Sequence, residues 1–199
     1  GLTRQIVLDR YDARPEKVDV VHNGIDLSDK QPGRELSDKA MNGEKIVLFL
    51  GRITMQKGPE YFIAAARKGL NVMPNVRFIV AGSGDMARSM IEMAAREGIG
   101  RKMVFTGFLR GKDVERVYRM SDLYIMPSVS EPFGLVALEA LSYGVPAIIS
   151  KQSGAAEVLH TVPKVDFWDI YELANQIVSI LRRPALHHYL QEVGLDEVH

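Results

Sequence analysis

The sequence predicts a doubly wound α/β fold, in which helices cover both faces of a parallel sheet. Short runs of apolar residues alternate along the chain with stretches of helical periodicity about ten to fifteen residues long. Alternation of this kind is typical of parallel strands joined by right-handed helical crossovers. Most residues of the strand runs are apolar, which indicates strands buried on both faces. We therefore expect a single Rossmann-like domain that binds ligands outside the carboxyl ends of its strands.

The expected strands are apolar runs that stop at or next to a small residue or a proline. They are residues 46–50, 76–81, 103–105, 123–126 and 147–150, with a last short strand around Val165. The expected helices have apolar residues at helical spacing or a residue suited to a helix start. They begin at Pro59, at Asp85 or Met86 (ending near Glu97) and at an Asp113 cap, and they cover residues 133–143, residues 170–181 and a shorter stretch after Pro184.

The first 44 residues differ in character from the rest of the chain. Residues 1–17 are polar and irregular, residues 18–22 form a short strand-like run, and residues 26–44 are rich in Asp, Lys, Ser and Gly. We interpret residues 1–44 as a linker and the remnant of a preceding domain. Residues 45–199 are the expected compact domain.

The composition is that of an ordinary globular protein. The chain has 199 residues, of which 46% are hydrophobic and 25% charged, and its formal net charge is zero. Without a dense basic patch, binding to nucleic acid is not expected. Cysteine is absent, which excludes disulfides and thiolate chemistry and favours a reducing, cytoplasmic location. No apolar run approaches the ~20 residues of a membrane span, and no signal-peptide pattern opens the chain.

Two glutamates bracket an expected helix start after the strand at residues 123–126. Glu131 lies in the loop before the helix, and Glu139 lies in its second turn. Between them, the N–H groups of Phe133, Gly134 and Leu135 would form an anion site at the carboxyl edge of the sheet. Two carboxylates that accept from hydroxyls on either side of a phosphate would suit a nucleotide-diphosphate sugar.

A simpler interpretation of the two glutamates is that Glu131 caps the helix and Glu139 is solvated. Against it, Glu139 is embedded in a helix that is apolar nearly all round, which implies burial. A buried glutamate needs a partner.

Two cations follow the first strand of the expected domain. Arg52 comes directly after Gly51, and Lys57 lies just ahead of a helix. A guanidinium fork and an ammonium charge together suit a diphosphate. The sequence has no Cys, no His-x-x-x-His and no Asp-x-Asp, so we expect neither a metal nor another cofactor, and we expect His187 and His188 to be solvated surface residues.

A dinucleotide site is the main alternative at the second strand. Gly82-x-Gly84-x-x-Ala87 follows that strand and matches the dinucleotide fingerprint. The fingerprint also needs an acidic residue about 20 positions later. Here Arg101-Lys102 precedes the next strand and Thr106-Gly107 follows it, so the sequence disfavours nicotinamide or flavin binding.

These residues resemble the nucleotide-binding half of retaining glycosyltransferases of the glycogen-synthase and sucrose-synthase type, the glycosyl transferases of group 1 with the two-domain GT-B fold. The likeness runs from about residue 18 to about residue 182. The matching pieces are Val18 to Asp26, Gly51-Arg52 with Lys57-Gly58, Val80 to Gly84, Thr106 to Leu109, Ser121-Asp122-Leu123, Pro127-Ser128, Glu131 to Gly134, Glu139-Ala140 and Gly144-Val145-Pro146. The two glutamates eight positions apart, with Phe-Gly between them, are the specific part of the match.

The resemblance implies roles for the charged residues. Arg52 and Lys57 would hold the diphosphate, Glu131 would bind the donor hexose, and Glu139 would bind the ribose hydroxyls. Transfer would retain the anomeric configuration without a metal, and Glu131 would orient the sugar and need not be a covalent nucleophile. The donor would be a UDP-, ADP- or GDP-linked hexose.

The resemblance also implies a binding surface made by backbone and small residues. These are Gly51, Gly82, Gly84, the backbone at Phe108 and Leu109 beside the base, and the N–H groups of Phe133, Gly134 and Leu135 beside the sugar.

The sequence departs from the family pattern in two ways. Ser153-Gly154-Ala155-Ala156-Glu157 stands where Gly-Gly-x-x-Glu is usual, and the Asp-Gly-x-x-Gly turn that follows it is missing. These departures bear on the subfamily rather than on the donor site.

The family's acceptor half would precede this region. The chain is therefore expected to be the donor-binding part of a longer enzyme and to be inactive alone. A sugar, glycan or lipid acceptor would bind the missing half, and a lipid acceptor would bring the parent protein to a membrane surface. Two other functions stay open: a sugar-nucleotide epimerase, although no histidine lies near Glu131, and a non-catalytic nucleotide-sugar-binding module, although the four charged site residues are all present.

Overall fold

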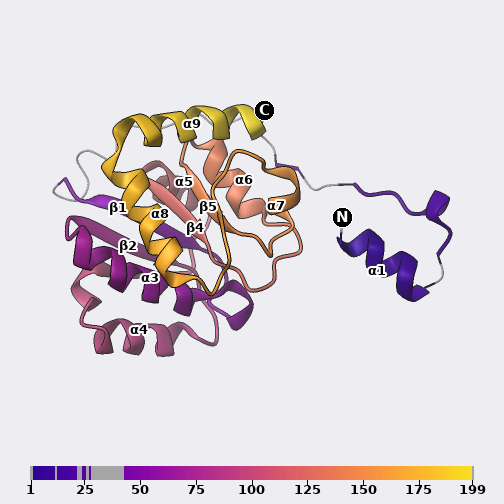
Figure 1. The fold of residues 1–199 in the computed structure, drawn as a ribbon. Coiled ribbons are helices and arrows are strands. Elements are labelled where there is room, and N and C mark those ends of the chain that lie inside the picture. The colour runs from indigo at the N-terminus through magenta and orange to yellow at the C-terminus, as the bar shows by residue number, and fades with distance from the viewer. Residues whose placement is uncertain (1, 12, 22–23, 26, 28–42, 199) are drawn as a thin grey trace.

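The computed structural model describes every residue except 1, 12, 22–23, 26, 28–42 and 199, and it contains the predicted doubly wound α/β domain (Figure 1). Six strands form an all-parallel sheet in the order β3-β2-β1-β4-β5-β6. The strands are β1 (Lys45–Leu50), β2 (Val76–Ala81), β3 (Met103–Gly107), β4 (Leu123–Met126), β5 (Ala147–Ser150) and β6 (Lys164–Val165). The order reverses between β1 and β4, and such a switch point opens a crevice at the carboxyl edge of a sheet.

Helices cover both faces of the sheet (Figure 1). They are α3 (Pro59–Val72), α4 (Ala87–Arg96), α5 (Lys112–Arg119), α6 (Leu135–Ser142), α7 (Ala155–Val158), α8 (Ile170–Arg182) and α9 (Pro184–Val198), with α1 (Leu2–Tyr11) near the start of the chain. Three short 3-10 helices are η1 (Pro15–Lys17), η2 (Met55–Lys57) and η3 (Gly100–Lys102). Within the described part of the chain, no helix is long and apolar enough to cross a lipid bilayer.

The sheet separates two hydrophobic cores. Because side chains alternate across a strand, Val47 and Phe49 of β1 face one core, whereas Ile46 and Leu48 face the other. Helices α3, α4 and α8 pack on the first core, and α5, α6 and α7 pack on the second. Burial on both faces explains why most residues of the strand runs are apolar.

Several local predictions near the chain ends are wrong. Residues 2–11 form helix α1, where we expected irregular chain, and residues 18–21 form no strand; the rest of that expected run and most of the expected linker lie outside the described residues. The last helix, α9, has 15 residues and is longer than α8, with 13. It is long because Leu186, Leu190 and Val193 pack against the first core over several turns.

Three predictions inside the domain also need correction. Helix α6 begins at Leu135 and not at residue 133, because Gly134 has a left-handed backbone with φ of +99°. Helix α5 is preceded by Gly111 with no side-chain cap, so Asp113 lies in its first turn and is not its cap. The four-residue helix α7, Ala155–Val158, was not predicted.

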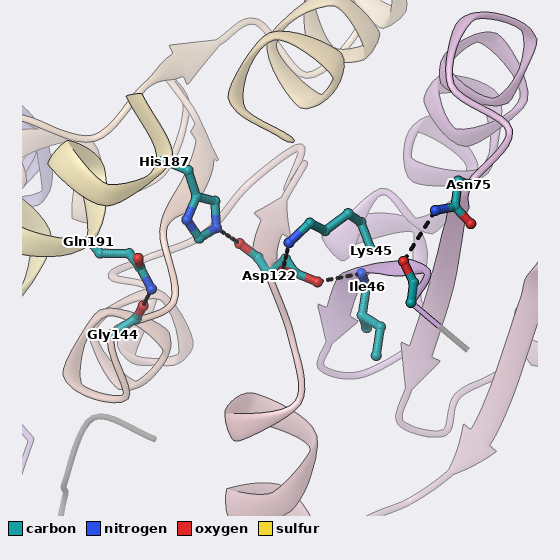
Figure 2. Close-up of polar contacts among 8 residues, drawn as sticks. Lys45, Ile46, Asn75, Asp122, Gly144, His187 and Gln191 are labelled. Carbon is teal, nitrogen blue, oxygen red and sulfur yellow. Dashed lines mark hydrogen bonds and ion pairs between the residues drawn. The ribbon is translucent and has the colours of Figure 1, made fainter. Parts of the chain in front are cut away.

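Asp122 connects several elements at the amino edge of the sheet, which is opposite the edge formed by the carboxyl ends of the strands (Figure 2). Its carboxylate accepts hydrogen bonds from the N–H of Ile46 and from Nζ of Lys45, both at 2.8 Å. Nε2 of His187, on α9, donates to the carbonyl of Asp122 at 2.7 Å, and Gln191 on the same helix donates to the carbonyl of Gly144 at 2.8 Å. His187 is therefore part of the packed structure and not the solvated residue that we expected.

Its neighbour His188 does lie on the exposed side of α9. More than half of its side chain is accessible to solvent, and it lies 3.2 Å from a carboxylate oxygen of Glu192 on the same helix.

Candidate functional site

A pocket of about 540 Å³ lies at the carboxyl ends of β1, β2 and β3. Three loops, one after each strand, form its walls. The lining residues are Leu50, Gly51, Arg52, Ala81, Gly82, Ser83, Gly84, Phe108, Leu109 and Val114. The structure thus brings together six of the residues that the sequence suggested for the nucleotide: Gly51, Arg52, Gly82, Gly84, Phe108 and Leu109.

Two of these glycines are required by the packing of the loops on each other. The φ of Gly82 is +144°, and a Cβ there would lie 1.8 Å from the carbonyl oxygen of Gly51. A Cβ on Gly84 would lie 2.1 Å from the carbonyl oxygen of Ile53, whose N–H donates to the carbonyl of Ser83 at 2.9 Å. Contacts within the protein therefore account for both glycines without any ligand.

The two cations of the β1 loop have different surroundings. Arg52 is exposed at the wall of the pocket, and its guanidinium has no side-chain partner among the described residues. Lys57, in contrast, forms an ion pair with Glu131 from the loop after β4. The Lys57 side chain is 18% exposed and that of Glu131 is 10% exposed.

The backbone holds Glu131 in place from both sides. The N–H of Val129 donates to the carbonyl of Gln56 at 3.0 Å, which joins the β4 loop to the loop that carries Lys57. The N–H of Gly154 donates to the carbonyl of Glu131 at 2.8 Å. The N-cap residue of α6 is Gly134, and the carboxylate of Glu131 pairs with Lys57, so Glu131 is not the helix cap of the simpler interpretation.

Helix α6 begins at the same edge as this ion pair. Gly134 turns the chain into the helix, and a Cβ there would lie 2.9 Å from the Met126 side chain at the end of β4. The first N–H groups of a helix carry partial positive charge. The start of α6, Lys57 and Arg52 are thus three sources of positive charge at one edge of the sheet.

Glu139, on α6, accepts a hydrogen bond from the hydroxyl of Tyr118 at 3.0 Å. Glu139 is half-buried rather than fully buried, and Tyr118 is a partner for its carboxylate within the protein. Tyr118 is fully buried, and its ring stacks on Tyr143 with centroids 5.3 Å apart. Burial, and then the nearby hydroxyl of Tyr124 and carboxylate of Glu139, raise the pKa of Tyr118 well above its usual range.

Tyr124, in the middle of β4, lies near both glutamates. Burial is the main cause that raises its pKa, and the negative charges of Glu131 and Glu139 add to that effect. Both carboxylates therefore lie close enough to this buried tyrosine to affect its pKa. The contact of Tyr118 with Glu139 was not predicted, although a buried tyrosine needs a partner for its hydroxyl and so could have signalled it.

Among the described residues, no group of three or more His, Asp or Glu side chains is arranged to hold a metal ion. The predicted site residues near this edge are instead two cations, Arg52 and Lys57, and two carboxylates, Glu131 and Glu139. Such groups can bind an anion flanked by hydroxyls.

The family model of the glycosyl transferases group 1 matches residues 35–194, so the chain belongs to this family. The domain has the fold of one half of a GT-B enzyme, as predicted. Membership of this family is consistent with nucleotide-sugar-dependent glycosyl transfer.

Curated relatives with similar sequences are longer than this chain. It is 36% identical over 157 residues to an uncharacterized glycosyltransferase of Methanocaldococcus jannaschii, covering 75% of this chain and 40% of that protein. It is 36% identical over 185 residues to the D-inositol 3-phosphate glycosyltransferase of Mycobacterium sp. strain JLS, covering 87% of this chain and 41% of that protein. The chain thus spans about two fifths of the length of these relatives.

Solved structures share the fold. The sucrose-phosphate synthase of Thermosynechococcus elongatus superposes with a TM-score of 0.85 at 27% identity, over all of this chain and 52% of that one. HepE of Anabaena, solved in complex with UDP-glucose, gives a TM-score of 0.86 at 22% identity, over 98% of this chain and 56% of that one. The C-terminal domain of a glycosyl transferase group 1 protein of Francisella tularensis gives 0.79 at 23% identity, over 88% of this chain and 96% of that one.

Proposed function

We propose that this domain binds the donor of a retaining, metal-independent hexosyltransferase, a nucleotide-diphosphate hexose. The observation that carries the proposal is the set of chemical groups at one edge of the sheet. An apolar pocket has an exposed arginine at its wall, a lysine pairs with a glutamate in the neighbouring loops, and a second glutamate on α6 accepts a hydrogen bond from Tyr118. A base, a diphosphate and two polyols are the matching parts of a nucleotide sugar.

In this proposal the base enters the pocket beside Phe108 and Leu109, and Glu139 accepts hydrogen bonds from the ribose. Arg52 and Lys57 bind the diphosphate, and Glu131 binds hydroxyls of the hexose. Complexes such as that of HepE with UDP-glucose support a nucleotide-sugar donor, because this chain shares their fold.

The transfer step requires stabilisation of the leaving diphosphate, because this group gains negative charge as its bond to the anomeric carbon breaks. Arg52, Lys57 and the N-terminus of α6 stabilise that charge. Glu131 orients the hexose so that an acceptor hydroxyl reaches the anomeric carbon from the face that the diphosphate leaves, and the proton of that hydroxyl passes to an oxygen of the leaving diphosphate.

The acceptor, a sugar, glycan or lipid, binds a second domain that precedes this one in the parent protein. Residues 1–44 are the linker and remnant of that domain, and residues 45–199 are the donor-binding domain. Transfer needs the acceptor to be held against the donor with water excluded, so the isolated chain does not catalyse it.

Isothermal titration with UDP, ADP and GDP, each with and without a chelator, tests donor binding. We expect at least one nucleotide to bind equally well in chelator. Arg52→Ala should weaken that binding by about 1.5–3 kcal/mol, as for a hydrogen bond to a charged group, which is roughly 10- to 150-fold. The free nucleoside should be unaffected.

Arg88→Ala is the matched control, because Arg88 is exposed on α4 and, within the part of the chain that the structure describes, pairs with Glu92 of the same helix. Its nucleotide affinity should equal that of the unaltered protein. Binding that disappears in chelator, or an Arg52 variant with unchanged affinity for the diphosphate, would contradict the proposal.

A further inference from the structure

We propose that Tyr118 is a positioning residue for nucleotide binding, because its hydroxyl holds the Glu139 carboxylate in the orientation that receives the ribose. This inference rests on the proposed function, in which Glu139 binds the ribose hydroxyls. Tyr118 would touch no part of the donor itself and would act on nucleotide binding through Glu139.

The ring of Tyr118 is fixed by its packing. It is fully buried on α5, stacks on Tyr143 with an interplanar angle of 19°, and meets Tyr124 edge to face with centroids 6.4 Å apart. The ring is therefore held between Tyr143, the C-cap residue of α6, and Tyr124 of β4, and this packing sets the position of its hydroxyl.

That hydroxyl contacts one oxygen of Glu139 and leaves the other available. It donates to Oε2 of Glu139 at 3.0 Å and lies 3.2 Å from the carbonyl oxygen of Val136, one turn earlier on α6. Oε1 of Glu139 takes no hydrogen bond from any described residue and is not among the buried unpartnered atoms. One carboxylate oxygen is thus anchored inside the protein, and the other can accept from a ligand hydroxyl.

The protonation states suit this arrangement. Burial raises the pKa of Tyr118, so its hydroxyl keeps its proton and remains a donor. The oxygens of a carboxylate accept hydrogen bonds. Ribose hydroxyls are donors, so the pair presents the acceptor that a ribose needs.

Helix α5 also connects this pair to the nucleotide pocket. Val114 lines the pocket, and Tyr118 follows it four positions later on the same face of the helix. One rigid element therefore forms part of the wall that receives the base and also positions the carboxylate for the ribose. The base and the ribose are joined in the ligand, so this shared element fixes the spacing between their two subsites.

The test compares a ribonucleotide with its 2′,3′-dideoxy analogue by isothermal titration, using whichever of UDP, ADP and GDP binds the unaltered protein most tightly. Tyr118→Phe keeps the ring and removes the hydroxyl. We expect it to weaken binding of the ribonucleotide about 5- to 20-fold and to leave the dideoxy analogue unchanged. Glu139→Ala should show the same selective loss, and the double variant should lose little more than Glu139→Ala alone.

Tyr124→Phe is the matched control, because Tyr124 belongs to the same buried cluster but its hydroxyl donates to the carbonyl of Leu50 at 3.4 Å. It should not change the preference for the ribonucleotide, and thermal unfolding of each variant checks that it is folded. The proposed role of Tyr118 would be overturned if Tyr118→Phe lost equal affinity for both nucleotides, or if the affinity losses in the double variant were additive. Either result would leave the proposed function standing. If none of the three nucleotides binds the unaltered protein, this inference and the proposed function both fail.

Discussion

Replacing Glu131 by glutamine should strengthen the binding of a bare nucleoside diphosphate, although Glu131 belongs to the proposed donor site. Without a ligand, Lys57 forms an ion pair with Glu131. If Lys57 binds the diphosphate, it must weaken that pair when the nucleotide arrives. A bare nucleotide brings no hexose to compensate Glu131, so this cost lowers its affinity. Glu131→Gln keeps the size of the side chain and removes the charge that competes for Lys57.

The environment of the pair sets the size of the effect. Exposed ion pairs contribute about 0.2–1 kcal/mol, and breaking a fully buried pair costs about 3–5 kcal/mol. The side chains here are 18% and 10% exposed, and the bound diphosphate replaces the lost partner of Lys57. We therefore expect Glu131→Gln to lower the free-energy cost of breaking the ion pair by about 1 kcal/mol, which corresponds to roughly fivefold tighter binding of the diphosphate.

Isothermal titration at low ionic strength measures the change, since salt screens charge interactions. The double variant Lys57→Ala with Glu131→Gln distinguishes release of Lys57 from simple loss of repulsion between Glu131 and the diphosphate. Asp166→Asn is the matched control, because it breaks an exposed ion pair with Lys151 that follows the strand ends at the same edge. Unchanged or weaker binding in Glu131→Gln would refute the reasoning, and so would an equal gain in the absence of Lys57.

Two further predictions concern stability. Asp122→Ala should destabilise the domain by about 1–3 kcal/mol, because the buried N–H of Ile46 and the ammonium of Lys45 lose their acceptor; thermal unfolding measures this loss, and nucleotide affinity should not change because Asp122 lies at the opposite edge. The free energy of unfolding should fall as pH rises above about 10, where tyrosines of the unfolded chain lose protons that Tyr118 and Tyr124 retain in the folded state. Denaturant titrations at pH 9 and pH 11 check this, and Tyr118→Phe should reduce the slope.

The sequence predicted the frame of the domain well because local signals are strong there. Strands β4 and β5 have the predicted bounds, since Pro127 ends one apolar run and Ser150 ends the other. The start of α6 was misplaced because it depends on a distant contact. Gly134 takes its left-handed conformation against Met126, and no local pattern shows that packing.

The candidate site was predictable in part for the same reason. Residues that directly follow parallel strands gather at one edge of a sheet, so the meeting of Arg52 with Gly82 and Phe108 could be expected. Individual side-chain pairs could not be foreseen. Lys57 and Glu131 are 74 positions apart, and Tyr118 and Glu139 are 21 apart, so each pair forms only through the arrangement of several elements.

The position of Asp122 has a consequence for how such a domain can diversify. Its bonds to β1 and α9 join the beginning and the end of the domain at the amino edge (Figure 2). These contacts hold the domain together at the edge opposite the proposed donor site. The loops at the carboxyl edge therefore do not have to join the beginning of the domain to its end. If the carboxyl-edge loops are replaced by those of a related enzyme, we expect the preferred donor to change while the domain keeps its fold. Other folds also support many chemistries by loop variation.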